Sequence, residues 1–577
     1  MKKVRSSTPE EPAQGKDQSV HTQEVSPIQG PAAKEFNRAL ACAQKAAARG
    51  NLELATAWCR YGARVAWWLC PGFFQSPEME QLLGEIGRKS AMPAMPPTAS
   101  MGAPTRFLHL MTQAYETGGH TRAVSRWIEI CAQYAPSEHH SILISKQGDD
   151  PLPGWLAHSA QSTGGDIFRL PPMPSWLQMA AEVRSKSSEF DVIVLHVHPD
   201  DPLPNLAFYD RPRPVIFFNH ADHAFTLGMD VAGIVADIRK AGHDLSSSLR
   251  AARPHKVLLP IPLTDGPKSS TGKAEARRKL GLPTNAPIAL TIGDLFRFKP
   301  GMGLSFPAAL KAICAQDPRV LVIAVGFSAS ESGELSELNQ STAGRFQSVG
   351  VVVDPEILEL YYSAADVYLD CFPYGSLTSV LDAALHALPV QRLKIPDLPI
   401  LWSDDLALDA VAAGASCTTD YVAEVVQWLQ WPGTKRAEFG ARFRAAVLQE
   451  HCGVSWKARW LDPAVKALQA SGEAPSHPGL DRIDEKPDRF RISTMFYLAG
   501  LPLSMFVAAV ILGMEDVPQR IRVSAVWVSV KPLLLDPAHD GMPWKRLLAF
   551  KELIKTCLPK RVITAVGRIL RSNQNKL

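Results

Sequence analysis

From Thr105 onward, apolar runs alternate with amphipathic segments in a regular order. Strands are predicted at "RFLHLMT", "SILIS", "DVIVLHVHP", "PVIFFNHADH" and "KVLLPIPL". The series restarts with the helix "KAEARRKLGLP" and continues through "IALTIGDL", "RVLVIAVGF", "SVGVVVD", "VYLDCFP" and "LPVQRLK". This alternation is typical of parallel sheets covered by helices on both faces. The sequence therefore predicts an α/β fold with two Rossmann-like halves, residues 105–262 and 270–470, that face each other across a cleft.

The flanking segments differ in composition from these halves. Residues 1–33 are polar and lack an apolar core, which predicts a disordered leader rather than a secretory signal. Residues 34–90 are Ala-rich at helical spacing and resemble tetratricopeptide-like helix pairs. One or two pairs are too few for a solenoid, so a packed helical cap is favoured. Residues 488–577 form a hydrophobic and basic extension that we expect to be mainly helical.

Composition restricts the class of protein. Hydrophobic residues make up 46% and charged residues 20% of the 577 residues, which excludes global disorder. A net charge of +4 is too small to indicate a nucleic-acid partner. The nine cysteines are scattered and form no C-x-x-C pair, so a reducing compartment is favoured and a structural zinc site is not expected. These features together predict a cytoplasmic protein.

The segment "DVYLDCFPYGSLTSVLDAALHALPV" leads from an apolar strand through a small, polar turn into a helix. The free N–H groups and the positive dipole end of such a helix bind phosphate. The expected diphosphate contacts are Gly375, Ser376, Thr378 and Ser379. Asp382, in the first turns of the helix, is a candidate acceptor for a ribose diol. Ordinary helix capping and favourable dipole placement are the alternative roles of these residues. A nucleotide-sugar site is the favoured interpretation.

Over residues 105–430 the sequence resembles a glycosyltransferase of the two-Rossmann (GT-B) architecture. The resemblance is carried by "ARRKLGLP…IALTIGDLFRFKP", by "YYSAADVYLDCFPYGSLTSVLDAALHALPV" and by the glycine-rich "GGHTR". The paired glutamates of the retaining families are replaced by Tyr374 and Asp382. The segment is closer to the O-linked N-acetylglucosamine transferases and to the bacterial cytoplasmic N-glycosyltransferases, which also carry a helical domain ahead of the catalytic halves. The resemblance implies an inverting transfer from a UDP-linked sugar.

The same resemblance assigns the donor phosphates to Lys299 in "FRFKP", with Arg297 as a second contact. A positive charge there would stabilise the departing nucleotide. The alternative for Lys299 is a solvated loop position. The chain contains no D-x-D triplet, so we expect a metal-independent reaction with the nucleotide-sugar as co-substrate and no further cofactor.

Polar residues at strand ends are candidates for acid–base chemistry. "NHADH" follows a strong apolar strand and offers His220 as a base and Asp222 as an orienting carboxylate, with His223 behind them. A turn satisfied by its own hydrogen bonds is the alternative, and metal ligation is less favoured because the spacing shows no third ligand. "HVHPDD" places His196 and His198 on one face of a strand and ranks below "NHADH".

His120 is the other candidate base, in the "GGHT" turn. Gly118 and Gly119 would let the backbone approach a ligand closely. The alternative is a simple turn before a helix.

The C-terminal region suggests a membrane surface. Met495 to Met514 is a 20-residue run without charge, for which a membrane span, an interfacial segment and a packed core are the alternatives. Residues 541–577 carry nine Lys/Arg against one Glu, and an amphipathic helix there would bind anionic lipid. A solvated helical face is the alternative. The prediction is a cytoplasmic protein peripheral to the inner face of a membrane.

Two functions remain open from the sequence. The first is a glycosyltransferase that uses a nucleotide-sugar donor and a glycan, a lipid-linked glycan or a protein as acceptor. The second is a non-catalytic two-Rossmann scaffold that binds a nucleotide-sugar or a partner protein. Substitution of Lys299 or Asp382 separates them, because only the first function has donor turnover to lose.

Overall fold

A computed structural model describes residues 31–69, 71–96, 105–251, 254–266, 271–328, 330, 332–396 and 401–470. Residues 1–30, the uncharged run from residue 495 to 514 and the basic segment 541–577 lie outside the described residues. Within the described ranges, no helix combines the length and the apolar character needed to cross a membrane. The membrane surface therefore stays a prediction.

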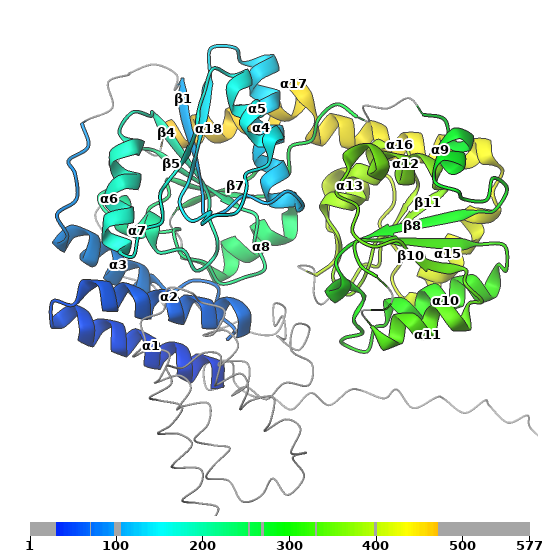
Figure 1. The fold of residues 1–577 in the computed structure, drawn as a ribbon, viewed down its shortest axis with the longest axis horizontal. Coiled ribbons are helices and arrows are strands. Elements are labelled where there is room, and N and C mark those ends of the chain that lie inside the picture. Colours follow the sequence, from blue (N-terminus) through cyan, green and yellow to red (C-terminus); the bar gives the residue numbers. More distant parts are fainter. Residues whose placement is uncertain are drawn as a thin grey trace, which may run out of the picture.

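The first half is built on a sheet of seven parallel strands in the order β3-β2-β1-β4-β5-β6-β7 (Figure 1). The strands are β1 (Arg106–Met111), β2 (His139–Ile144), β3 (Ile167–Arg169), β4 (Val192–His196), β5 (Val215–Asn219), β6 (Ile234–Asp237) and β7 (His255–Leu258). β3 (three residues) and β6 (four residues) were not among the predicted strands. The crossover helices are α4 (Gly119–Tyr134), α5 (Gly154–Ser162), α6 (Trp176–Ser187), α7 (Leu203–Ala207) and α8 (Lys240–Leu249).

Three N-terminal helices pack against this half: α1 (Pro31–Ala48), α2 (Leu52–Leu69) and α3 (Pro77–Lys89) (Figure 1). The Ser76 side chain caps α3 by accepting from the Met79 N–H, with a proline at the first helical position. Buried side chains of all three helices share one hydrophobic core with Leu108, Ile193 and Phe217 of the sheet. The N-terminal helices are therefore a packed cap on one face of the first half.

The second half contains a parallel sheet in the order β10-β9-β8-β11-β12. Its strands are β8 (Ile288–Ile292), β9 (Leu321–Val325), β10 (Phe346–Ser348), β11 (Val367–Leu369) and β12 (Val390–Gln391). The helices around it are α9 (Lys273–Lys279), α10 (Phe306–Gln316), α11 (Gly333–Ser341), α12 (Pro355–Ala364), α13 (Thr378–Leu385), α14 (Leu406–Asp409) and α15 (Thr418–Gln430).

The strand predicted at "SVGVVVD" is misplaced. β10 ends at Ser348, and Gly350 then adopts a φ of +82°, which turns the chain out of the sheet. Val351 and Val353 are 65% and 51% exposed. A run of β-branched residues suggested a strand, but the positive φ of the glycine ends it.

The C-terminal helices connect the two halves. α16 (Gly433–His451) packs against α13 and α14 of the second half. The chain then returns to the first half as α17 (Gly453–Trp456), a π-helical turn (Lys457–Leu461) and α18 (Asp462–Ala470) (Figure 1). The Trp456 ring lies 5.7 Å from the Trp127 ring, and its Nε1–H donates to the Pro260 carbonyl at 2.7 Å. Through this crossing the C-terminal segment contacts both halves.

Candidate active site

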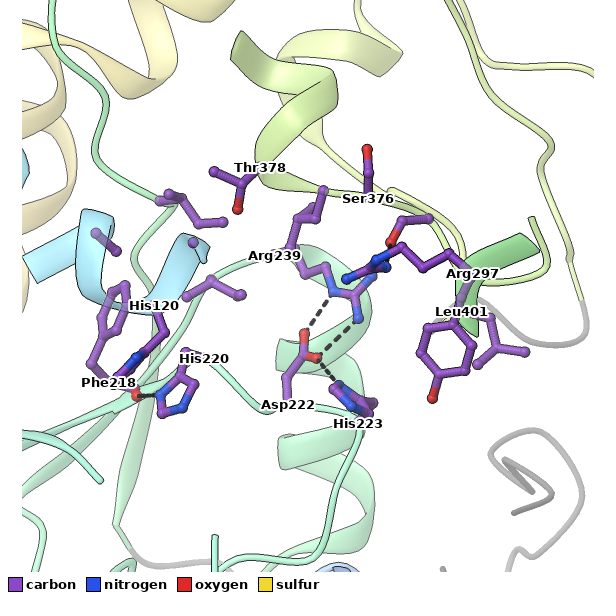
Figure 2. Close-up of a pocket in the computed structure, with 17 residues that line it drawn as sticks. His120, Phe218, His220, Asp222, His223, Arg239, Arg297, Ser376, Thr378 and Leu401 are labelled. Atoms are coloured by element: carbon purple, nitrogen blue, oxygen red, sulfur yellow. Dashed lines mark hydrogen bonds and ion pairs between the residues drawn. The ribbon is translucent and has the colours of Figure 1, made fainter. Parts of the chain in front are cut away.

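A cavity of about 200 Å³ lies between the two halves. Its walls are segments that follow the carboxyl ends of strands, where parallel α/β sheets bind ligands (Figure 2). The first half contributes Gly119, His120, Ala123, Phe218, His220, Asp222, His223, Ile238, Arg239 and Ile261. The second half contributes Arg297, Tyr374, Gly375, Ser376, Leu377, Thr378 and Leu401.

Two helix N-termini meet at this cavity. α4 begins after Gly118, with φ +115°, and α13 begins after Leu377, with φ +50°. Neither Gly118 nor Leu377 caps its helix with its own side chain, although the Leu377 N–H donates to the Ser403 hydroxyl at 2.9 Å. Gly119 and Thr378 line the same wall, and a Cβ at Gly119 would overlap the Thr378 hydroxyl. The absence of a side chain at Gly119 lets the two positive dipole ends approach each other, which favours an anion between them.

Two arginines add positive charge to the cavity. Arg297 follows β8 and donates to the Gly375 carbonyl. Arg239 follows β6 and forms a two-point ion pair with Asp222, with N–O distances of 2.7 and 2.9 Å (Figure 2). Asp222 is the single acidic residue in the lining, so the cavity keeps an excess of positive charge. Sequence reasoning missed Arg239, which follows the unpredicted strand β6.

Lys299 does not line the cavity. A 3₁₀ turn (Leu295–Phe298) follows β8 and buries Phe298 against Phe306 and Phe327. The next residue, Lys299, is exposed. The structure thus brings Arg297, and not Lys299, together with the Ser376 turn.

Asp370, which directly follows β11, hydrogen-bonds to the Ser376 turn. One Asp370 oxygen accepts from the Ser376 N–H at 2.7 Å and from the Ser376 hydroxyl at 2.8 Å. Burial raises the pKa of Asp370, although these hydrogen bonds and Arg297 oppose the shift. Sequence reasoning missed this carboxylate, whose signal is an acidic residue inside the apolar run "VYLDCFP". Ser379 and Gly118 do not line the cavity.

Asp382 also lies outside the cavity lining. Its Oδ1 accepts from Arg126 of α4 at 2.8 Å, so it forms an ion pair between the two halves. In this conformation its partner is a guanidinium, and the ribose contact predicted for it stays a prediction.

His220 and His120 are adjacent neutral imidazoles in the cavity wall, with ring centroids 4.8 Å apart. Burial lowers the pKa of His220 to about 4 and that of His120 to about 3, and the neighbouring histidines contribute. His220 Nδ1 donates to the Phe218 carbonyl at 3.4 Å, which leaves Nε2 as the proton-accepting atom (Figure 2). His120 Nε2 donates to the His196 carbonyl at 3.3 Å.

The partners of the Asp222 carboxylate are Arg239 and His223, and not the rings of His220 or His120. It is 1% exposed, and its two oxygens bind Arg239, with His223 Nδ1 3.5 Å away. Arg239 holds the pKa of Asp222 below its usual range, although burial opposes the shift. β4 ends at His196, so His198 lies in the following loop rather than on the strand face predicted for both.

One group of described residues has metal-ligand chemistry. Ligand atoms of Cys131, Glu138 and His140 lie within 4.8 Å of one another. This group is at the amino-terminal edge of the first sheet, because His140 is the second residue of β2. It is therefore separate from the cavity.

No protein-family model and no curated protein matches the chain by sequence. Solved structures do match. A mutant of the Thermobaculum terrenum O-GlcNAc transferase aligns with a TM-score of 0.50 and 15% identity over 76% of this chain and 85% of that one. Anabaena HepE in complex with UDP and glucose aligns with a TM-score of 0.48 and 15% identity, over 63% of this chain and 99% of that one. A Rickettsia africae glycosyltransferase aligns with a TM-score of 0.47 and 12% identity, again over 63% of this chain and 99% of that one. The predicted GT-B fold is confirmed.

Proposed function

We propose that the protein is a glycosyltransferase that moves a sugar from a UDP-linked donor to a glycan, a lipid-linked glycan or a protein. The observation that carries this proposal is the cavity between the halves. Two helix N-termini without a side-chain N-cap, Arg297 and a neutral histidine converge there. The fold shared with an O-GlcNAc transferase supports the same class of reaction.

The diphosphate of the donor would lie against the N-termini of α4 and α13. Its charge is balanced by the dipoles of the two helices and by the Arg297 guanidinium. The same groups stabilise the negative charge that develops on the diphosphate as the bond to the sugar breaks. Removing one hydrogen-bond donor that is aimed at such a developing charge typically raises the barrier by about 2.7–4 kcal/mol. This arrangement requires no metal ion for charge neutralisation.

His220 would act as the general base. The acceptor hydroxyl donates its proton to Nε2, and its oxygen attacks the anomeric carbon on the face opposite the diphosphate. The sugar is transferred with inversion, and the diphosphate leaves with the bonding electrons. The low pKa of His220 keeps the imidazole in its proton-accepting form at neutral pH.

The cavity is small for a whole nucleotide-sugar, since ligand sites typically measure about 300–1,000 Å³. We therefore expect the halves to separate for donor entry. The ion pair between Arg126 and Asp382 is one of the contacts that must break.

A thermal-shift screen of nucleotide-sugars tests the proposal, because a ligand that binds only the native state raises the melting temperature. Selective stabilisation by one UDP-sugar, reduced in Arg297→Met, is the expected result. Donor hydrolysis or transfer, followed by chromatography of the released UDP, then separates an enzyme from a scaffold. A panel without any shift contradicts the proposal, and binding without turnover favours the non-catalytic alternative.

A further inference from the structure

Three residues with different metal-binding chemistry meet at the amino-terminal edge of the first sheet. Cys131 belongs to the last turn of α4, His140 is the second residue of β2, and Glu138 directly precedes that strand. Their ligand atoms lie within 4.8 Å of one another. A thiol, a carboxylate and an imidazole at these distances offer the sulfur, oxygen and nitrogen ligands that zinc binds in proteins.

Two of these ligand atoms already have the spacing of a tetrahedral zinc site. His140 Nε2 lies 3.3 Å from Glu138 Oε2, which is longer than a usual N–H···O hydrogen bond of about 2.7–3.2 Å. Zinc bonds of about 2.0–2.2 Å to nitrogen and oxygen place two ligand atoms of a tetrahedron about 3.3–3.5 Å apart. A cysteine sulfur, with a bond of about 2.3 Å, lies about 3.6 Å from the other ligand atoms. A movement of the Cys131 sulfur by about 1 Å therefore completes the set.

The Glu138 carboxylate is held at the oxygen that the metal would not use. Lys457 Nζ lies 3.2 Å from Oε1 of Glu138, whereas Oε2 faces His140. The same ammonium lies 2.6 Å from Oδ1 of Asp462, so it bridges two carboxylates. Carboxylates that bind a metal are in turn hydrogen-bonded by outer groups, which fix their orientation. Lys457 is thus placed to orient Glu138.

The His140 imidazole also has outer partners. Its Nδ1 lies 2.9 Å from Nε2 of His109, and Nδ1 of His109 lies 3.0 Å from Nε2 of His196. The Phe107 ring stacks on the His140 ring with centroids 4.7 Å apart. When Nε2 of His140 binds a metal, its Nδ1–H donates to His109, and His109 donates in turn to His196. Three imidazoles at most 1% exposed cost free energy that apolar side chains would not, and orienting a metal ligand gives them a role.

A second cavity gives a metal ion access to this group. It has a volume of about 370 Å³, and Phe107, Glu138 and Asp462 are among the residues that line it. Cys131 and His140 are buried, whereas Glu138 is half-buried and reaches the cavity. Water from this cavity can supply the fourth ligand of the tetrahedron.

We propose that Cys131, Glu138 and His140 bind one zinc ion, with water from the second cavity as the fourth ligand. The Cys131 sulfur binds as a thiolate, and its proton is released to water when the metal enters. The two negative ligands balance the charge of Zn²⁺, while Lys457 balances Asp462. No oxidation or reduction takes place. The site is independent of the proposed function, because it lies at the opposite edge of the sheet from the catalytic cavity.

The position of the site indicates what the metal stabilises. Its ligands join the C-terminal end of α4 to the start of β2, and Lys457 begins the π-helical turn of the returning C-terminal segment. The other end of α4 lies at the catalytic cavity. The scattered cysteines argued against a structural zinc site, because a single cysteine followed by Glu and His seven and nine positions later forms no familiar pattern.

Metal analysis and cobalt substitution of the untagged full chain test the site. The wild type is expected to bind one Zn²⁺ per chain, and its Co²⁺ form should show the near-ultraviolet charge-transfer band of a cobalt–thiolate bond. Cys131→Ser should lose both the band and the bound zinc. The controls are Cys314→Ser, a buried cysteine of the second half, and His139→Gln, an exposed neighbour of the ligands. Both controls should keep the band and the zinc.

Variants of the outer groups test the proposed orientation of the ligands. Lys457→Met and His109→Gln leave all three ligands in place and are expected to weaken zinc affinity about 10–100-fold, measured against a competing chelator. Unchanged affinity in both variants overturns the roles assigned to the outer groups. Tighter zinc binding in Lys457→Met also overturns them, because the ammonium would then compete with the metal.

X-ray absorption spectroscopy of the zinc-loaded wild type needs no variant, so it decides the matter even if a ligand variant does not fold. It should show one sulfur at about 2.3 Å and nitrogen or oxygen ligands at about 2.0–2.2 Å. A shell without sulfur, as expected for zinc on surface histidines, overturns the site. So does a cobalt–thiolate band that persists in Cys131→Ser, or a wild type that neither contains zinc nor binds added zinc to saturation.

Discussion

Arg126 of the first half binds Asp382 of the second half across the cleft, with 2.8 Å between Nη2 and Oδ1. Their side chains are 17% and 23% exposed, so the pair is partly screened from solvent. We expect it to favour the closed state by about 1 kcal/mol, which corresponds to roughly a fivefold change in donor KM.

The pair therefore predicts that Arg126→Met and Asp382→Asn lower the donor KM equally, with no further change in the double variant. A double-mutant cycle measures this coupling. If Asp382 binds the ribose instead, Asp382→Asn will be far more damaging than Arg126→Met, and the two effects will add.

Arg297→Met is expected to lower kcat about 10²–10³-fold, because it removes a cation from the site of the departing diphosphate. Lys299→Met is the matched control, since Lys299 is exposed two residues away. Steady-state kinetics of donor turnover compare the two. Loss of activity in Lys299→Met with normal activity in Arg297→Met would restore the assignment made from the resemblance.

His220→Gln is expected to lower kcat about 10²–10⁴-fold without loss of donor affinity. The wild-type pH profile gives an independent test. Because the base must be neutral and its pKa is about 4, kcat/KM should be constant near pH 7 and fall as the pH drops through about 4. A profile that falls between pH 7 and 6 argues against His220 as the base. His243→Gln, outside the cavity, serves as the control.

The fold could be predicted because each half repeats apolar runs separated by amphipathic helices. The misplaced strand at Val351–Val353 shows the limit, since local patterns do not show where a glycine turns the chain. The site residues were harder to predict from the sequence. Arg297 and Lys299 are equivalent in the sequence, and burial of Phe298 decides which of them reaches the cavity. The partner of Asp222 is Arg239, 17 positions away, and no local pattern reveals that pair.

Asp404 predicts a pH-dependent contact between the halves. It accepts from the Ala241 N–H at the start of α8, at 2.5 Å, and is 6% exposed. Burial raises its pKa from 3.8 to about 6, against the opposing effect of Arg239. A raised pKa means that the native state holds the proton more tightly than the unfolded state. This contribution is complete below about pH 3.8 and is lost as the pH rises through about 6.

Asp404→Asn keeps an acceptor for Ala241 and removes the buried charge. The variant should gain stability over the wild type at pH 8, by up to roughly 3 kcal/mol, and about half as much at pH 5. Thermal unfolding at both pH values measures the difference, with the exposed Asp149→Asn as control. A gain that is equal at pH 5 and pH 8 would be inconsistent with a raised pKa.

The central claim is that the cavity binds a diphosphate through Arg297 and the two helix N-termini. Calorimetric titration with UDP and with uridine isolates the diphosphate contribution. UDP should bind wild type and Lys299→Met roughly tenfold to a hundredfold more tightly than uridine, and this advantage should be clearly smaller in Arg297→Met, which keeps the two helix N-termini. Equal affinities for UDP and uridine in the wild type, or an unchanged UDP advantage in Arg297→Met, would contradict the claim.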